Sequence, residues 1–507
     1  MMGIKQRQQH LFNYQVNLDK RVRSDHPLRR INEIIDFTFI RYRVEKYYGY
    51  NGNVSVDPAV IMKMMFLLFY DDVSSERELM KTIPERLDYM WFLGYGLDDC
   101  IPDHSVLSKA RARWGTEVFE ELFVRIVWQC VTAGLVDGTK IHMDGSLVDA
   151  DASKNSVVKG PPELIAQLKK IYQKEEEKLE EKEDPTTKQS YYKPVNKGMF
   201  SKTDPDAPVV RHGKGESRPR YKNHRVVDDV HGVITAVETT AGDVEENAKL
   251  LDLVDQHERN THVKVDTVVA DCQYGTTDNF RECYKRGIRS HMGDFRAHQD
   301  KKGSRAGIFS EEDFIYDVET DTYKCPAGER LRRGKYMPTR KAYQFSGRGK
   351  VCLNCSLREK CTRSKINPRT LKRHENHEMI LAAREQSHSE QAKKDREKRK
   401  WRMEGSFADA ANNHGFKRSR WRQLKNQQIQ DYLIAAIQNI RILINNIGSG
   451  SKAAGMEAIA YRNELHNLGP VPKPGIFHHS LWGYKNPIHQ LERNCLFRSR
   501  SDQFRMI

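Results

Sequence analysis

The chain has 507 residues, 38% of them hydrophobic, so it is long enough for a sizeable core and for roughly two to four domains. Its formal net charge of +16 favours a polyanionic partner, nucleic acid before a membrane surface. A polar start, no apolar run long enough to cross a bilayer and nine unevenly spaced cysteines argue against a membrane protein or a disulfide-rich secreted protein, and a soluble cytoplasmic protein is expected.

The first 135 residues are predicted to be all-helical. Capping residues and proline positions predict helices over residues 28–48, 58–70, 74–85 and 102–114. Several short helices that end in a basic one are typical of a helix-turn-helix DNA-binding domain. The cations of the last helix are therefore candidates for contact with DNA: Lys109, Arg111 and Arg113.

From about residue 138 the pattern changes to a mixture of strands and helices. Alternating or β-branched runs predict strands over residues 138–150, 263–271 and 288–292, and a hairpin over 221–240. Helices are expected over residues 243–257, 276–287 and 424–447. The first of these is predicted from a capping-box pattern, in which Asp243 is followed three residues later by Glu246.

This order predicts a mixed α/β domain that is interrupted twice. The domain covers residues 136–292 and 376–447, with a polar insertion at about 155–220 that includes an exposed helix. A second insertion, residues 293–375, contains clustered cysteines, and the tail from 448 to 507 carries no clear signal.

Three acidic residues stand out by their positions. Asp144 lies in the first strand, Asp271 ends a buried-type strand and Glu404 lies on a late helix, so a sheet with a helix packed across it can bring them together. Three carboxylates in a basic protein suit Mg²⁺, and two such ions can hold the attacking and leaving oxygens of a phosphoryl transfer. Asp149 and Asp151 remain alternatives for the first ligand.

Glu404 lies within a strongly basic run. Residues 391–425 contain twelve Lys or Arg against four Asp or Glu, with interleaved aromatic residues that suit a nucleic-acid groove. A metal ion on Glu404 would separate this carboxylate from DNA, while the flanking side chains hold neighbouring phosphates. The candidates in this run are Arg399, Lys400, Arg402, His414, Lys417, Arg418, Arg420 and Arg422. Lys222 and His224 are further candidates, with a plain strand-surface role as the alternative.

Four cysteines of the second insertion fall within 37 residues, with the spacing C-x26-C-x2-C-x5-C: Cys325, Cys352, Cys355 and Cys361. One C-x-x-C pair and two outlying cysteines can supply four thiolates to a tetrahedral structural Zn²⁺, so we expect a zinc-ribbon-like module. An iron–sulfur cluster would use the same ligands, and unpaired thiols in a loop are the simplest alternative.

Together these segments resemble the DDE transposases of bacterial insertion sequences. The likeness in the N-terminal part is carried by RSDHPLRRINEIIDF (23–37), VDPAVIMKMMFLLFYDDVSSERELMK (56–81) and IPDHSVLSKARARWG (101–115). In the remainder it is carried by KIHMDGSLVDADASKNS (140–156), YKNHRVVDD (221–229), VVADCQYGTTDNF (268–280) and RKWRMEGSFADAANNHGFKRSRWR (399–422).

The resemblance implies a multidomain α+β protein, with a helical DNA-binding domain followed by an RNase H-like catalytic domain. It implies a polynucleotidyl transferase in which Asp144, Asp271 and Glu404 bind Mg²⁺ or Mn²⁺. Water would cleave the element's ends, and a freed 3′-hydroxyl would then attack target DNA. The implied partners are double-stranded terminal inverted repeats, target DNA and further copies of the chain in a dimer or larger assembly, near the bacterial nucleoid.

One position departs from the family pattern. Relatives often carry a lysine seven residues after the catalytic glutamate, where this chain has Ala411. Two other functions therefore stay open: a metal-dependent nuclease that cuts without joining, and a DNA-binding regulator or inactive transposase that only binds the ends.

Overall fold

The structure is a computed structural model that describes residues 16–49, 55–153, 156–159, 199–211, 213, 215–294 and 306–447. The exposed helix expected in the polar insertion and the tail after residue 448 lie outside the described residues. None of the helices in the described part is both long and apolar enough to cross a membrane.

The N-terminal part is helical, as predicted. Its helices are α1 (Leu18–Arg21), α2 (Pro27–Ile34), α3 (Phe39–Val44), α4 (Pro58–Tyr70), α5 (Glu76–Thr82), α6 (Leu87–Leu93), α7 (Ser105–Trp114) and α8 (Glu117–Thr132). The prediction of one helix over residues 28–48 is wrong, because α2 and α3 are separate. Between them the Asp36 carboxylate accepts hydrogen bonds from the backbone N–H of Thr38, at 2.8 Å, and from its hydroxyl, at 2.7 Å, which favours a turn over a continued helix.

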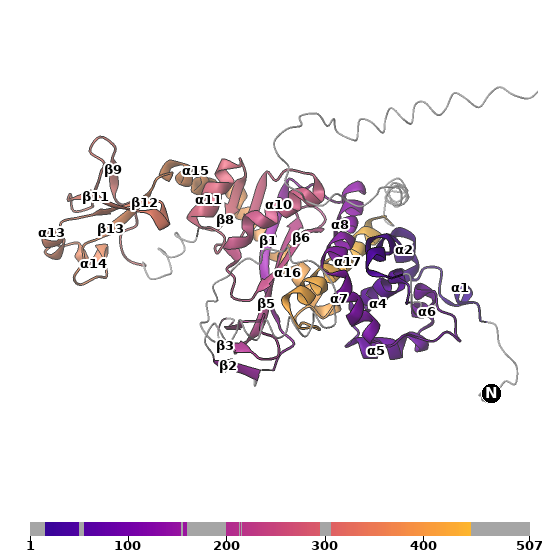
Figure 1. Cartoon of the computed structure of the whole chain (residues 1–507). Helices are drawn as coiled ribbons and strands as arrows, with labels where there is room; N and C mark the ends of the chain where they lie inside the picture. Colours follow the sequence, from indigo (N-terminus) through magenta and orange to yellow (C-terminus); the bar gives the residue numbers. More distant parts are fainter. Residues whose placement is uncertain are drawn as a thin grey trace, which may run out of the picture. The chain divides into compact units, whose positions relative to one another are not determined.

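The centre of the fold is a six-stranded mixed sheet (Figure 1). Its strands are β1 (Lys140–Asp149), β4 (Val209–Arg211), β5 (Ser217–Asp228), β6 (Ile234–Ala241), β7 (Thr267–Ala270) and β8 (Arg289–Met292). The order is β4-β5-β1-β7-β8, and β6 also pairs with β5. Strand β1 is antiparallel to β5 and parallel to β7, and β7 is parallel to β8, so the predicted strands and hairpin are confirmed.

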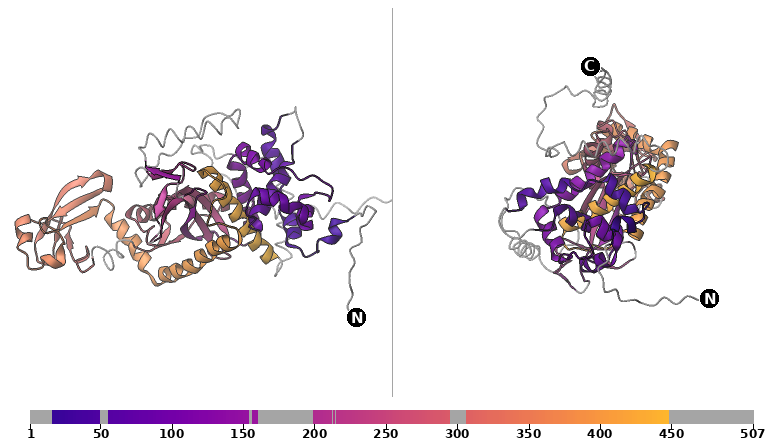
Figure 2. Two further views of the ribbon diagram at one scale, coloured as in Figure 1. Left: turned by 90° about the horizontal axis from the view of Figure 1, so that it is seen from below. Right: turned by 90° about the vertical axis from the view of Figure 1, so that its right-hand side faces the viewer.

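Helices cover both faces of this sheet (Figures 1 and 2). On one face, α10 (Leu250–Thr261) and α11 (Thr277–Lys285) pack over an apolar layer that includes Ile141 and Val268. On the other face, α16 (Glu390–Asn413) crosses β1, β7 and β8, and α17 (Leu424–Ile447) packs on β6. The sheet is therefore the middle of three layers.

Helix α17 joins the sheet to the N-terminal helices. It contacts β6 on one side and α8 and α4 on the other, and every residue from 431 to 440 is buried. A helix buried all round is expected to be apolar on every side, and Ile434, Ile437 and Ile440 fit this rule. One hydrophobic core therefore extends from the N-terminal helices through α17 to β5 and β6.

The polar residues of α17 cover the free edge of β6. Asn439 accepts a hydrogen bond from the backbone N–H of Ile234 at 2.8 Å and donates one to its carbonyl at 2.7 Å. Gln428 accepts a bond from the backbone N–H of Thr239 at 2.6 Å. Unpaired backbone groups on an edge strand are costly when buried, so these amides make the attachment of α17 specific.

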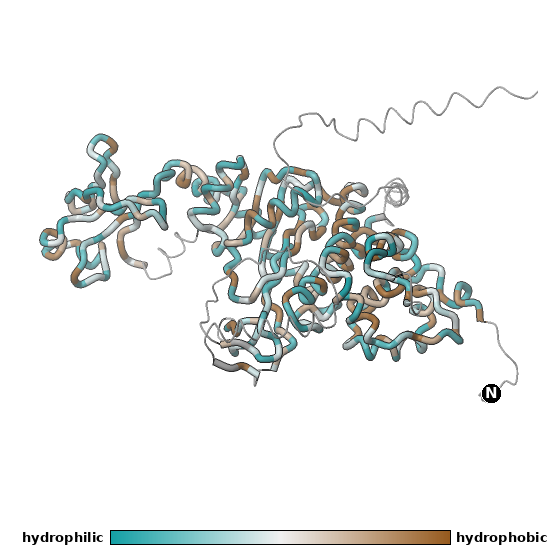
Figure 3. Tube along the Cα trace, viewed as in Figure 1, coloured by the Kyte–Doolittle hydropathy of each residue, from teal (hydrophilic) through white to brown (hydrophobic). Residues whose placement is uncertain are grey.

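The second insertion forms a separate five-stranded antiparallel sheet. Its order is β13-β12-β11-β10-β9, with β9 (Ile315–Asp317), β10 (Thr322–Lys324), β11 (Arg330–Met337), β12 (Ala342–Ser346) and β13 (Thr370–His374). We call this sheet, with α13 (Gly349–Leu353) and α14 (Arg358–Cys361), the cysteine module. It has its own small core, and Figure 3 shows hydrophilic residues along much of its trace. Helix α15 (His377–His388) follows it, and β2 (Val157–Lys159) pairs with β3 (Met199–Ser201) in the first insertion.

The shared core predicts that the N-terminal helices and the sheet unfold together. Replacing the fully buried Ile437 by alanine should lower the free energy of unfolding by about 2–5 kcal/mol, because it leaves a cavity in α17. The measurement is urea unfolding followed by circular dichroism, with hydrogen exchange reporting α4 and β6 separately.

The control for this prediction is Leu381→Ala, which truncates an exposed side chain on α15 and should change stability little. Loss of protection in β6 with unchanged protection in α4 would contradict a shared core.

Candidate active site

Three carboxylates from three separate elements meet beside the central strand. They belong to Asp144 in β1, Asp271 directly after β7 and Glu246 at the start of the short 3-10 helix η4 (Glu246–Lys249). One oxygen from each lies within 4.8 Å of the others. In the part of the chain that the structure describes, no other group of three or more Asp, Glu, His or Cys side chains is drawn together this closely.

The pairing of the strands explains why the two aspartates meet. In the parallel ladder, Ile141 lies opposite Val268 and His142 opposite Val269. Two residues further along each chain, the same register puts Asp144 level with Asp271. Residues that are level in neighbouring strands lie about 5 Å apart and point to the same face of the sheet, so the two side chains are neighbours.

Glycine at residue 145 leaves the space that the Glu246 side chain occupies beside the aspartates. A Cβ atom at Gly145 would stand 2.9 Å from the Glu246 carboxyl carbon, which is closer than atoms can pack. The predicted capping box is wrong, because the side chain of Glu246 does not return to cap the helix that follows. The chain instead forms η4 before α10, and this places Glu246 over β1.

The cluster carries more negative charge than its surroundings balance. Burial raises the pKa of Asp144 above its usual range, and the neighbouring Asp271 adds to this effect. Burial likewise raises the pKa of Glu246, with further contributions from both aspartates. Two cations oppose these shifts: Arg399 Nη1 lies 2.8 Å from Asp144 Oδ2, and Lys222 Nζ lies 3.6 Å from Glu246 Oε1. Three clustered carboxylate groups with only two cations beside them are a suitable site for a hard divalent cation.

The structure does not bring Glu404 into this cluster. Glu404 lies on the exposed face of α16, and its carboxylate makes no ion pair or hydrogen bond with the described residues. The face of α16 that packs on the sheet presents Arg399 to Asp144 instead. The role of Glu404 as a metal ligand stays a prediction. Glu246 was missed because its sequence context matched a helix cap, and no local signal distinguished the two roles.

The residues predicted to contact DNA fall into two groups by burial. Six of them are exposed: Lys109, Arg113, Lys400, Lys417, Arg418 and Arg422. Seven others are partly or fully buried: Arg111, Lys222, His224, Arg399, Arg402, His414 and Arg420. The six exposed residues stay candidates for contact with DNA phosphates. Most of the seven buried or partly buried residues bond other groups inside the protein.

Several of the buried cations and histidines hold elements of the fold together. Arg111 forms an ion pair with Glu76, and its guanidinium lies 3.8 Å from the centre of the Trp421 ring. His414 bonds the carbonyl of Phe69, at 2.8 Å, which ties the end of α16 to α4. His224 pairs with Thr240 at 2.8 Å, and burial lowers its pKa to about 3, so the ring is neutral and cannot attract phosphate.

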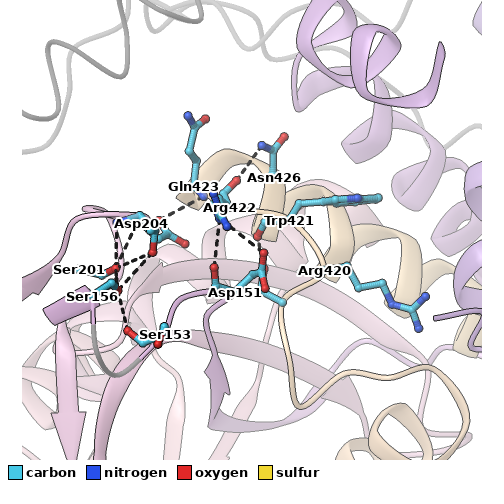
Figure 4. A network of polar contacts seen from close by, with 12 residues as sticks. Asp151, Ser153, Ser156, Ser201, Asp204, Arg420, Trp421, Arg422, Gln423 and Asn426 are labelled. Carbon is cyan, nitrogen blue, oxygen red and sulfur yellow. Dashed lines mark hydrogen bonds and ion pairs between the residues drawn. The ribbon is translucent and has the colours of Figure 1, made fainter. Parts of the chain in front are cut away.

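The end of the connection between α16 and α17 (residues 414–423) is held against the first insertion and the residues just before it by a polar network (Figure 4). The guanidinium of Arg422 donates a hydrogen bond to the backbone carbonyl of Asp151, at 3.2 Å. Asp204 accepts hydrogen bonds from the backbone N–H of Gln423, at 3.3 Å, and from the hydroxyl of Tyr221, at 2.6 Å. The exposed cations of this connection therefore stand on a well-anchored segment.

The four cysteines of the cysteine module line one hollow of about 670 Å³. Burial raises the pKa of Cys352 and of Cys361, and the neighbouring cysteines add to both shifts. Their sulfur atoms are close enough to interact electrostatically, although they do not meet as tightly as the three carboxylates. Zinc binding at these residues stays a prediction.

An acidic cluster in a strongly basic protein is typical of enzymes that act on nucleic acids with metal ions. Comparison with known families agrees with this class. A transposase domain (DUF772) matches residues 16–113, and a transposase DDE domain matches residues 324–444. Both matches are to transposase domains, and they support an insertion-sequence DDE transposase, that is, a DNA transposase. The second match includes Glu404 and the four cysteines but none of the three clustered acids.

Two further comparisons add little. The chain matches no curated protein. Among solved structures, that of the piggyBac transposase synaptic complex with hairpin DNA matches at 10% sequence identity, covering 89% of this chain and 86% of that chain. The TM-score is 0.31, which is too low to relate the two folds.

The buried carboxyl of Asp204 predicts a pH dependence of stability. Burial raises its pKa to about 6 from an ordinary value of 3.8, so the folded state favours the protonated form. Its contribution to stability is full below about pH 4 and is lost as the pH rises through 6. The unfolding free energy of the wild type should therefore fall by roughly 2 kcal/mol, relative to that of Asp204→Asn, when the pH is raised from 4.5 to 8. Urea unfolding of both proteins at the two pH values is the measurement.

Tyr221→Phe provides a matched variant for this prediction. It removes the hydroxyl that donates to the Asp204 carboxylate, so the loss of stability should move to higher pH. An Asp204→Asn protein whose pH profile is parallel to that of the wild type would contradict the assignment.

Proposed function

We propose that the cluster of Asp144, Asp271 and Glu246 is the phosphoryl-transfer site of this transposase. The observation that carries the proposal is the convergence of three carboxylates, from three separate elements, to within 4.8 Å of one another. Mg²⁺ or Mn²⁺ is the class of ion that such oxygen donors bind best, and a bound ion supplies charge that offsets the negative charge of a phosphate in displacement.

The topology of the sheet supports a catalytic domain of the RNase H-like type. A central strand is antiparallel to the first arm of a hairpin and parallel to the next two strands, and helices cover both faces. This is the arrangement that the resemblance to DDE transposases implies, with one aspartate on the central strand and a second at the end of its parallel neighbour. The two insertions then correspond to residues 155–220 and to 293–375.

In this proposal each side chain has a distinct task. Asp144, Asp271 and Glu246 hold the metal ions, and the strand register keeps the two aspartates level. Arg399 bonds Asp144 and lies beside the place where a phosphate would approach, so it can orient that carboxylate. The exposed cations Lys417, Arg418 and Arg422 would hold phosphates of the same DNA, in exchange for their present contacts with Ser146 and Asp151.

The reaction that this site would support has two in-line displacements at phosphorus. Water first cleaves one strand at each end of the element, and the freed 3′-hydroxyl then attacks target DNA. The N-terminal helices would bind the terminal inverted repeats through Lys109 and Arg113, both exposed on α7. Two ends must be paired for such joining, so a dimer or larger assembly is part of the proposal.

The resemblance implies that Glu404 is the third metal ligand, whereas the cluster contains Glu246. Substituting each glutamate by glutamine can show which of the two binds the metal. We expect Asp144→Asn, Asp271→Asn and Glu246→Gln each to reduce metal-dependent nicking of DNA that contains the element's ends by at least about 100-fold. The reason is the loss of one ligand oxygen from the cluster. The measurement maps nicks at nucleotide resolution, in Mg²⁺ and in EDTA, with DNA that flanks the gene as substrate.

The matched control is Glu404→Gln, which makes the same chemical change outside the cluster. Binding of Mn²⁺, followed as a rise in Tm, should be lost in Glu246→Gln and kept in Glu404→Gln. Full nicking by Glu246→Gln together with none by Glu404→Gln would contradict the proposal and would assign the third metal ligand to Glu404 on α16. Tight binding to the ends without nicking by the wild type would show an inactive transposase and would direct attention to Ala411.

We further propose that the four clustered cysteines bind one structural Zn²⁺. All four line one hollow of the cysteine module, whose apolar core is small, so a metal would add stability that the core alone cannot provide. The purified chain is expected to contain about one zinc per chain by elemental analysis. Cys352→Ser should lose it, whereas Cys283→Ser, which alters a buried cysteine in α11, should retain it. Iron in place of zinc would indicate a cluster instead.

A further inference from the structure

The cysteine module has a large surplus of positive charge. Residues 315–374 contain sixteen Lys or Arg against five Asp or Glu, a surplus of eleven out of the net +16 of the whole chain. These 60 residues lie entirely in the described part of the chain. Such a density of like charge destabilises the folded module through repulsion and attracts a partner of opposite charge.

The two faces of the five-stranded sheet differ in character. One face packs on the apolar core through Tyr323, Leu331, Phe345 and Leu371. Because side chains alternate along each strand, the residues between them point to the opposite face. The cations on this opposite face are Lys324, Arg330, Arg332 and Lys372, and all four are exposed. We call this surface the basic face.

The register places these four side chains on one surface. Lys324 lies opposite Arg330, Thr322 opposite Arg332, and Gln344 opposite Lys372. The face therefore extends across four strands, from β10 to β13, or about 14 Å at the usual strand spacing of ~4.8 Å. This width suits an extended ligand that contacts several strands at once.

None of the four cations of the basic face forms an ion pair with a carboxylate in the described residues, although Arg330 lies near enough to Asp317 to help lower the pKa of that carboxyl. Some other cations of the module do have close partners. Arg333 pairs with Asp321 at 2.7 Å, and Arg373 lies over the ring of Tyr316 at 3.7 Å. The acidic residue that shares the basic face, Asp317, accepts three hydrogen bonds from its own turn, the shortest at 2.7 Å from the Thr320 hydroxyl. The four cations of the basic face are therefore distinguished by lying together on one sheet surface with their charged groups not held by ion pairs to other described residues.

We infer that the basic face binds the phosphate backbone of duplex DNA. The exposed side chains on this face include no Phe, Tyr or Trp, so it cannot stack bases as a single-strand site does. Lysine and arginine spread over a flat sheet bind phosphates without reading the sequence. The inference rests on the proposed function only for the choice of DNA as the polyanion, and it assigns a DNA contact to a module separate from the acidic cluster.

The test measures how DNA affinity depends on salt. The full chain in EDTA, so that no cleavage occurs, is titrated with a random-sequence duplex over a range of salt concentrations. Replacing Lys324, Arg330, Arg332 and Lys372 together by glutamine should reduce the slope of log K against log salt by about 3–4, since each phosphate contact contributes about 0.9. The affinity for duplexes with and without the element's ends should fall by the same factor.

A control variant removes the same charge from the same module at other places. It carries glutamine at four exposed lysines outside the basic face: Lys341, Lys350, Lys360 and Lys365. This control should keep most of the slope. An unchanged slope in the first variant, or an equal loss in the control, would overturn the inference and leave the proposed function intact. Failure of the unaltered chain to bind DNA would overturn the proposed function itself.

Discussion

The parallel pairing of β1 with β7 is the constraint on which the candidate site depends. Backbone hydrogen bonds set the register of the two strands, and that register leaves Asp144 and Asp271 side by side where the ladder ends. Neither carboxylate could approach the other by side-chain attraction alone, because like charges repel and both lose water on burial. The main chain therefore supplies the free energy that holds an unfavourable arrangement together, and the same arrangement suits a divalent cation.

The edge of the sheet imposes a second constraint. Strand β6 would present unpaired backbone groups to an apolar interface, and the amides of Asn439 and Gln428 on α17 satisfy them. Once α17 is attached in this way, its other sides are available to pack with α4 and α8. The residues that precede α17 are fixed in turn, since Arg420 and His414 bond groups at the end of α4. The basic connection between α16 and α17 is thus part of the core architecture.

Charge is distributed between three places with different physical roles. The acidic cluster is half-buried and short of counter-charge, which favours the uptake of a cation. The connection between α16 and α17 combines the largely buried Arg420, which holds the structure, with Arg418 and Arg422, which pair with Asp151 but keep much of their side chains at the surface. The cysteine module concentrates exposed cations on one face of a sheet. A transposase must hold DNA at several points while one phosphate meets the metal, and this separation of charges provides for both requirements.

The sequence by itself determined the elements and much of the chemistry. Local signals such as the Asp57 cap, the alternation in β1 and the stripe of isoleucines along α17 depend on neighbours within a few residues, so most N-terminal helices and the main strands of the central sheet could be predicted. The five strands of the cysteine module were not predicted. Asp144 and Asp271 could be selected because each lies on a recognisable strand. The helix break at Asp36 was missed, since a side chain bonding its own backbone competes with an otherwise helical pattern.

Only the tertiary structure decided which side chains meet. Glu246 has the local context of a helix cap, and its place in the cluster depends on the space left by Gly145, a hundred residues earlier in the chain. From the sequence, His224 and Arg111 were expected to lie on the surface and contact DNA, yet both are buried. Their burial could not be predicted, because the packing around them follows no local sequence pattern. Secondary structure follows from short-range propensity, whereas burial and proximity depend on contacts between residues far apart in sequence, and these exist only once the chain has folded.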